Sequence, residues 1–98
     1  MTLPVFDRRV VRMPGSRTVL LRYYIFASAA NDSAQIGDNA YPTVYSLYVQ
    51  KQQKGSIAES AFFYDITRLP QKARSLLRLL SANTVTPASI PDVLEDWL

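Results

Sequence analysis

Residues 57–80 read IAESAFFYDITRLPQKARSLLRLL, and the spacing of apolar side chains changes within this stretch. Alternation predicts a strand that places Phe62, Tyr64 and Ile66 on one face and Phe63 on the other. From residue 69 onward the apolar residues recur at helical spacing, at Leu69, Ala73, Leu76, Leu77 and Leu80. The stretch therefore predicts the point where a sheet ends and helices begin.

Further strands are predicted on the N-terminal side of this point. Residues 17–27 (RTVLLRYYIFA) and 43–51 (TVYSLYVQK) are rich in β-branched and aromatic side chains and contain neither glycine nor proline. A turn at Gly55 would join the second of these segments to residues 57–66 as a hairpin. Residues 4–13 are expected to form an edge strand or an extended N-terminal arm. The result is an antiparallel meander of three to four strands.

Helices are predicted for the C-terminal third of the chain. Thr67 is the expected N-cap of the first helix, with Pro70 in its first turn and Asn83 in the left-handed position after its end. Residues 87–98 are expected to form a second helix capped by Thr86. Strands followed by helices indicate one α+β domain over residues 1–98, with both helices packed on one sheet face. The small, polar residues 28–42 are expected to form a mobile loop.

The C-terminal residues also resemble a known group of proteins. The phrases Tyr64-Asp65-Ile66-Thr67, Asn83-Thr84-Val85-Thr86-Pro87 and Asp92-Val93-Leu94-Glu95-Asp96-Trp97-Leu98 are similar to those of an uncharacterised family of small bacterial proteins. Members of that family end in a V-S-P … D-V-x-E-D-F-L phrase, and they tend to carry histidine where this chain has Ser89. The resemblance implies a small bacterial protein and transfers no functional site.

The composition argues against catalysis. The 98 residues include no cysteine and no histidine, which removes thiolate nucleophiles, the commonest general base and the commonest metal ligands. The acidic cluster of Asp92, Glu95 and Asp96 is expected to be a solvated helix face. We therefore expect no enzyme, no metal and no cofactor. A cysteine-free chain with no long apolar run is typical of a cytoplasmic protein without a membrane partner.

One face of the predicted sheet is the candidate binding surface. The face opposite the helices is expected to carry Leu20, Arg22, Tyr24, Phe26, Val44, Tyr48 and Phe63. Such a face is too apolar to be left in water, so it needs a cover. The N-terminal arm at residues 4–13, a partner subunit and stacked nucleic-acid bases are the three alternatives.

Two functions fit this surface. The first is a non-enzymatic protein-interaction or regulatory module, self-associating as a homodimer through the aromatic face. The second is binding of single-stranded nucleic acid by aromatic stacking and arginine contacts. A net charge of only +3 and the lack of an aromatic-glycine ribonucleoprotein motif count against the second. The arginine-rich residues 1–22 are either a solvated surface or a patch that meets an anion.

Overall fold

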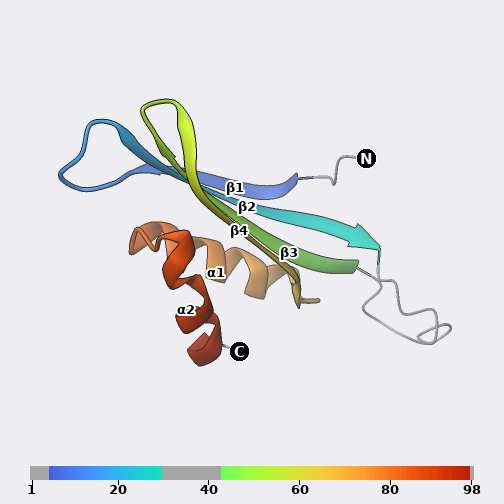
Figure 1. Cartoon of the computed structure of the whole chain (residues 1–98). Helices are drawn as coiled ribbons and strands as arrows, with labels where there is room; N and C mark the ends of the chain where they lie inside the picture. The colour runs from blue at the N-terminus through green and yellow to red at the C-terminus, as the bar shows by residue number, and fades with distance from the viewer. Residues whose placement is uncertain (1–4, 30–42, 98) are drawn as a thin grey trace, which may run out of the picture.

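The computed structural model describes residues 5–29 and 43–97 and shows an antiparallel sheet followed by helices (Figure 1). The strands pair in the order β1-β2-β3-β4, so the sheet is a four-stranded meander and the predicted α+β fold is confirmed. The strands are β1 (Val5–Arg12), β2 (Val19–Ala29), β3 (Thr43–Gln53) and β4 (Ser56–Thr67). The helices are α1 (Pro70–Ala82), the short 3-10 helix η2 (Pro87–Ser89) and α2 (Ile90–Trp97).

The N-terminal segment extends the sheet. Residues 5–12 pair with β2 as an edge strand, and Phe6 and Val11 pack against the core on the helix side. The segment therefore does not lie across the second sheet face, and the alternative in which it covers that face is wrong. Residues 28 and 29 continue β2, and the rest of the expected loop at 28–42 lies outside the described residues.

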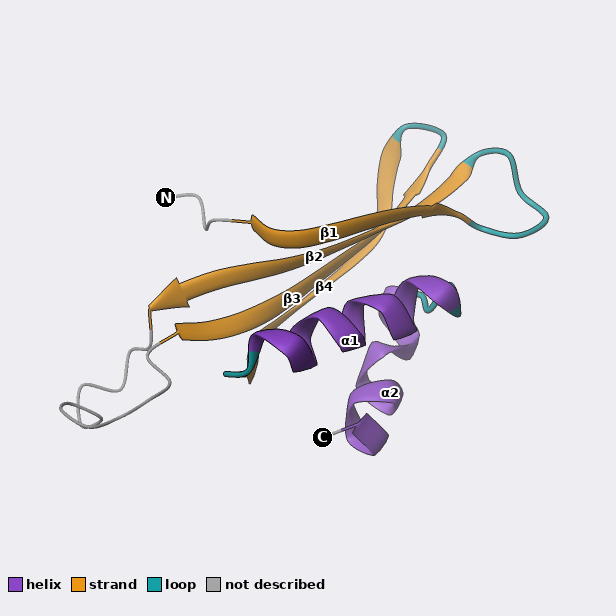
Figure 2. Cartoon of the chain, turned by 180° about the vertical axis from the view of Figure 1, so that it is seen from behind, coloured by secondary structure: helices purple, strands orange, loops and turns teal. Residues whose placement is uncertain are grey.

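The core lies between one sheet face and the helices, which are on the same side of the sheet (Figure 2). Both helices contribute fully or nearly fully buried side chains: Ala73, Leu76, Leu77 and Leu80 from α1, and Ile90 and Leu94 from α2. The sheet contributes Leu21, Tyr23 and Ile25 of β2 with Tyr45, Leu47 and Val49 of β3. This is the face that alternation predicted for the two central strands. No helix in the described residues has the length and apolar character needed to cross a membrane.

The start of α1 differs from the prediction. The helix begins at Pro70, and Leu69 precedes it in an extended conformation (φ −107°, ψ 120°). Proline restricts the residue before it to extended backbone, so Leu69 cannot join the helix and is left 44% exposed. Thr67 is not the N-cap; its hydroxyl accepts a hydrogen bond from the Leu69 N–H (3.2 Å) before the helix begins.

The end of α1 is a Schellman motif centred one residue later than predicted. Thr84, and not Asn83, has the left-handed conformation (φ 47°). The Val85 N–H donates to the Leu80 carbonyl (3.0 Å), and the Thr84 N–H donates to the Ser81 carbonyl (3.3 Å). The Val85 carbonyl in turn accepts a hydrogen bond from the hydroxyl of Tyr23 (2.8 Å). The connection between the helices is thereby fixed to the central strand β2.

An irregularity in β4 changes which side chains face the core. Tyr45 pairs with Thr67 and Leu47 pairs with Phe63, so residues 64–66 of β4 lie opposite the single residue Ser46. Asp65 takes a positive φ of 53°, and its N–H donates to the buried Ser46 hydroxyl (3.1 Å). Alternation does not continue through such a bulge. Phe63 therefore packs on the helix side, in register with Leu47, and the prediction that placed it on the opposite face is wrong.

Candidate binding surface on the open sheet face

The sheet face away from the helices, called the open face below, is defined by the strand register. Its positions alternate with those that enter the core. They are Val5, Arg8, Val10 and Arg12 of β1; Leu20, Arg22, Tyr24 and Phe26 of β2; Ser46, Tyr48, Gln50 and Gln52 of β3; and Ile57, Ser60 and Phe62 of β4. The helices α1 and α2 lie on the other side of the sheet (Figure 1).

Aromatic rings form a continuous band across this face. Tyr24 pairs with Tyr48 and Tyr48 pairs with Phe62, so the rings come from three neighbouring strands. The centroid distances are 6.0 Å for Tyr24–Tyr48, 6.4 Å for Tyr48–Phe62 and 5.9 Å for Tyr24–Phe26. These separations are within the range of favourable aromatic pairs. The band therefore holds its own shape before any partner binds.

A chain of polar side chains runs beside the aromatic band. The Arg22 Nε donates to the Gln52 Oε1 (3.1 Å), and the Gln52 Nε2 donates to the Gln50 Oε1 (3.3 Å). The Gln50 Nε2 then donates to the Tyr48 hydroxyl (3.0 Å). Hydrogen bonds of this kind restrict long side chains that would otherwise be ordered only on binding. The open face is thus partly preorganised.

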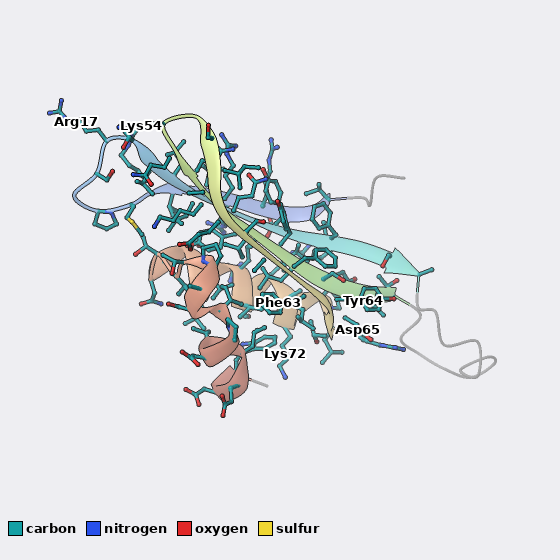
Figure 3. The ribbon with its side chains drawn as sticks, in the orientation of Figure 1. Arg17, Lys54, Phe63, Tyr64, Asp65 and Lys72 are labelled. Atoms are coloured by element: carbon teal, nitrogen blue, oxygen red, sulfur yellow. The ribbon has the colours of Figure 1, made fainter. Side chains whose placement is uncertain are left out.

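Positive charge is confined to one half of the open face. Arg8, Arg12 and Arg22 belong to β1 and β2, whereas the open-face positions of β3 and β4 are uncharged. No open-face position of the described register is acidic: Asp7 and Glu59 pair with the helix-side positions Ile25 and Lys51, and Asp65 lies in the bulge of β4, where it forms an ion pair with Arg68. The hairpin turns add Arg17 and Lys54 at one end of the sheet, where the Lys54 N–H donates to the carbonyl of Thr18 (3.1 Å); both residues are labelled in Figure 3.

Several apolar side chains of this face are open to solvent. Val5, Val10, Ile57 and Phe62 are 47–54% exposed, although each carries a large hydrophobic side chain. Single exposed apolar residues are ordinary, but a set that surrounds an aromatic band on one face makes that face a candidate interaction site.

The predicted site residues divide between the two sides of the sheet. Leu20, Arg22, Tyr24, Phe26 and Tyr48 lie on the open face and are partly exposed. Val44 pairs with Ser28 and has the same alternation as Tyr48, so it is on the predicted side of β3, but it is fully buried and its side chain is not available to a partner in this structure. Phe63 lies on the helix side of β4, where its label is seen between the strand and α1 in Figure 3.

Sequence reasoning missed other members of the surface: Arg8, Val10, Gln50, Gln52, Ile57 and Phe62. Simple alternation puts Phe62 on the same face as Ile66, which is buried, but the bulge between them breaks the alternation. Arg8 and Val10 could be placed on this face only once the N-terminal segment was known to pair with β2. The one available signal of the bulge was Asp65. It is an acidic residue within an apolar strand, and aspartate tolerates left-handed backbone.

Acidic side chains, hollows and buried titratable groups are few in the described residues. Within residues 5–29 and 43–97, no group of three acidic side chains gathers closely enough to hold a metal ion. A shallow hollow between β4 and η2 is lined by Glu59, Ser60, Pro87 and Ala88. Its one carboxylate has an oxygen, Oε2, 4.0 Å from the Lys51 ammonium. Burial raises the pKa of Tyr23 well above its ordinary value, but the Tyr23 hydroxyl donates to a backbone carbonyl inside the core, so its role is structural.

These features define an α+β protein with a four-stranded meander, helices on one face and a band of aromatic side chains on the other. Residues 3–98 match a family of unknown function, DUF6514, and the chain belongs to that family. Comparison with curated proteins and with solved structures found no match.

Proposed function

We propose that this chain is a non-enzymatic protein-interaction module of the bacterial cytoplasm, and that its open face is the contact surface. The observation that supports this proposal is the aromatic band of Phe26, Tyr24, Tyr48 and Phe62, which lies on the face opposite the helices. Because the N-terminal segment is already used as an edge strand, it does not cover the band.

The chemistry of the surface suits a protein partner. Protein interfaces are enriched in tyrosine, phenylalanine and arginine and depleted in acidic residues and lysine, and the open face has this composition. Aromatic and arginine side chains also supply most of the binding energy when a partner excludes water from them. The hydrogen-bonded Arg22, Gln52 and Gln50 reduce the entropy that binding would cost.

The test compares two arginine substitutions in a tagged chain used to capture proteins from an extract of its native cells. Phe62→Arg places a charge at the exposed end of the aromatic band, and Leu79→Arg places the same charge on an exposed residue of α1. We expect proteins that bind the wild type and the Leu79 variant but not the Phe62 variant. An identical set of captured proteins for both variants would show that the open face is not the contact surface.

Binding of single-stranded nucleic acid is the second candidate. It is favoured by Arg8, Arg12 and Arg22, which share a face with the rings and have no acidic neighbour on it in the described register. Fluorescent oligonucleotides titrated at low salt would test this function, since phosphate contacts are strongest there. Absence of binding under those conditions eliminates it.

A further inference from the structure

We propose that the open face binds a second copy of the chain, with Arg8 of each copy over Phe62 of the other. The two copies would be related by a twofold axis that runs parallel to the strands, between β2 and β3. This inference rests on the proposed function, because it identifies the partner of the same surface. It follows from the way in which charged and aromatic residues are divided between the two halves of the face.

The arginines restrict how two such faces can meet. Sheets that pack face to face keep their strands nearly aligned, so the twofold axis lies either across the strands or along them. An axis across the strands places β1 over β1 and β2 over β2. Arg8, Arg12 and Arg22 would then meet the same arginine-bearing half of the partner. Like charges opposed in an interface are strongly unfavourable, so this arrangement is excluded.

An axis along the strands places each half over the complementary half. β1 then lies over the partner's β4, and β2 lies over the partner's β3. Because Arg8, Tyr24, Tyr48 and Phe62 are in register, Arg8 meets the partner's Phe62 and Tyr24 meets the partner's Tyr48. The next rows bring Arg22 over the partner's Gln50 and Arg12 over the partner's Ile57. No arginine faces another arginine in this arrangement.

The contact of arginine with an aromatic ring is already used elsewhere in the chain. The Arg74 guanidinium lies 4.4 Å from the ring centroid of Phe6, and the Lys72 ammonium lies 4.9 Å from that of Trp97. Both pairs lie on the helix side of the sheet, and Lys72 is labelled there in Figure 3. A cation over a ring face is a favourable contact that strengthens when water is excluded. Arg8 and the partner's Phe62 would form the same kind of pair twice in each dimer.

The size of the face indicates a weak dimer. Strands about 4.8 Å apart and about eight residues long, at about 3.3 Å per residue, give four strands a footprint of about 500 Å². Two copies would bury about 1,000 Å², near the lower limit for a specific interface. We therefore expect a dissociation constant of about 10–100 μM.

The test changes the charge at position 8 and at position 62 in separate variants. The mass of each is measured by sedimentation equilibrium at about 10 to 500 μM protein. The variants are Arg8→Glu and Phe62→Arg; both side chains are exposed, so both chains should fold. Each variant alone should dimerise at least about tenfold more weakly. Arg8→Glu removes the cation over the ring of Phe62, and Phe62→Arg places an arginine opposite the partner's Arg8. An equimolar mixture should restore the dimer, because one contact becomes a salt bridge and the other remains as in the wild type.

The outcomes separate this inference from the proposed function. Recovery in the mixture, but not in either variant alone, supports the dimer and its axis. A wild type that stays monomeric at 500 μM, at least about five times the expected dissociation constant, overturns the inference. The proposed function still stands in that case if the extract experiment finds proteins lost only with Phe62→Arg. A dimer that neither substitution weakens, or a mixture that stays monomeric, also overturns it.

A second pair of substitutions tests the same axis if a variant of the first pair fails to fold. Arg12→Glu and Ile57→Arg occupy the row nearest the hairpin turns, and both residues are exposed. The same axis predicts the same recovery on mixing. As a control, Arg8→Glu mixed with Ile57→Arg places the exchanged charges in different rows, and this mixture should recover less than either matched pair.

Discussion

Replacing Tyr23 by phenylalanine should change both the stability of the protein and its dependence on pH. Tyr23 is fully buried, and its hydroxyl donates to the Val85 carbonyl at 2.8 Å. Without that hydroxyl, the carbonyl is left without its donor inside the core. Leaving a buried polar group unpaired costs about 1–3 kcal/mol, so we expect the free energy of unfolding at pH 7 to fall by that amount.

The pH dependence follows from the buried phenol. In the unfolded chain tyrosine titrates near pH 10, whereas burial raises the pKa of Tyr23 in the folded protein. Above about pH 10 the unfolded chain therefore holds fewer protons than the folded chain at this site. Its contribution to the free energy of unfolding is complete below pH 10 and falls by about 1.4 kcal/mol for each pH unit above it.

The assay is urea-induced unfolding of the wild type and of Tyr23→Phe at several pH values between 7 and 11. Other groups titrate in both proteins, so the difference between the two curves isolates Tyr23. That difference should be about 1–3 kcal/mol at pH 7 and should shrink by about 1.4 kcal/mol at pH 11. Tyr24→Phe, on the open face of the same strand, retains Tyr23 and should keep the wild-type slope. A constant difference from pH 7 to pH 11 would refute the reasoning.

Three further substitutions test the packing by chemical denaturation. Leu77→Ala should cost about 2–5 kcal/mol because Leu77 is fully buried in the core, and a loss below about 0.5 kcal/mol would show that α1 packs through another face. Thr84→Gly should stabilise the protein by about 1 kcal/mol because Thr84 has a left-handed φ of 47°, and a loss of stability would contradict that conformation. Phe63→Arg should cost about 3 kcal/mol or more, whereas Phe62→Arg should stay within about 1 kcal/mol; equal losses would mean that the two rings are not on opposite faces.

The sequence was sufficient to predict the buried face of a strand or helix where the two sides of that element differ in composition. In β2, apolar residues at Leu21, Tyr23 and Ile25 alternate with residues that include Arg22, and the alternation predicted the buried face correctly. The leucines of α1 recur at helical spacing between basic residues, so its core face could also be predicted. These elements contain no backbone irregularity that would shift the pattern.

Prediction failed where a local backbone feature shifted the pattern. Residues 61–64 of β4 are all apolar, so alternation there had to be inferred from Ile66, on the other side of the left-handed Asp65. At Leu69 the restriction imposed by Pro70 overrode the helical spacing. On the candidate surface, Arg8 and Val10 joined Tyr24 only through the pairing of β1 with β2, which is a tertiary contact. Alternation within a single strand carries no information about such pairing.

The irregular register of the outer strands also bears on how the protein avoids uncontrolled assembly. The central pair, β2 with β3, runs without interruption from Val19 opposite Gln53 to Ala29 opposite Thr43. The pairs that involve β1 and β4 are broken, once between Val5 and Asp7 and twice along β4. An outer strand with bulges presents a discontinuous row of N–H and C=O groups, which is a poor template for adding another chain. Growth by strand addition has no natural end, whereas a contact through the open face is complete with two copies.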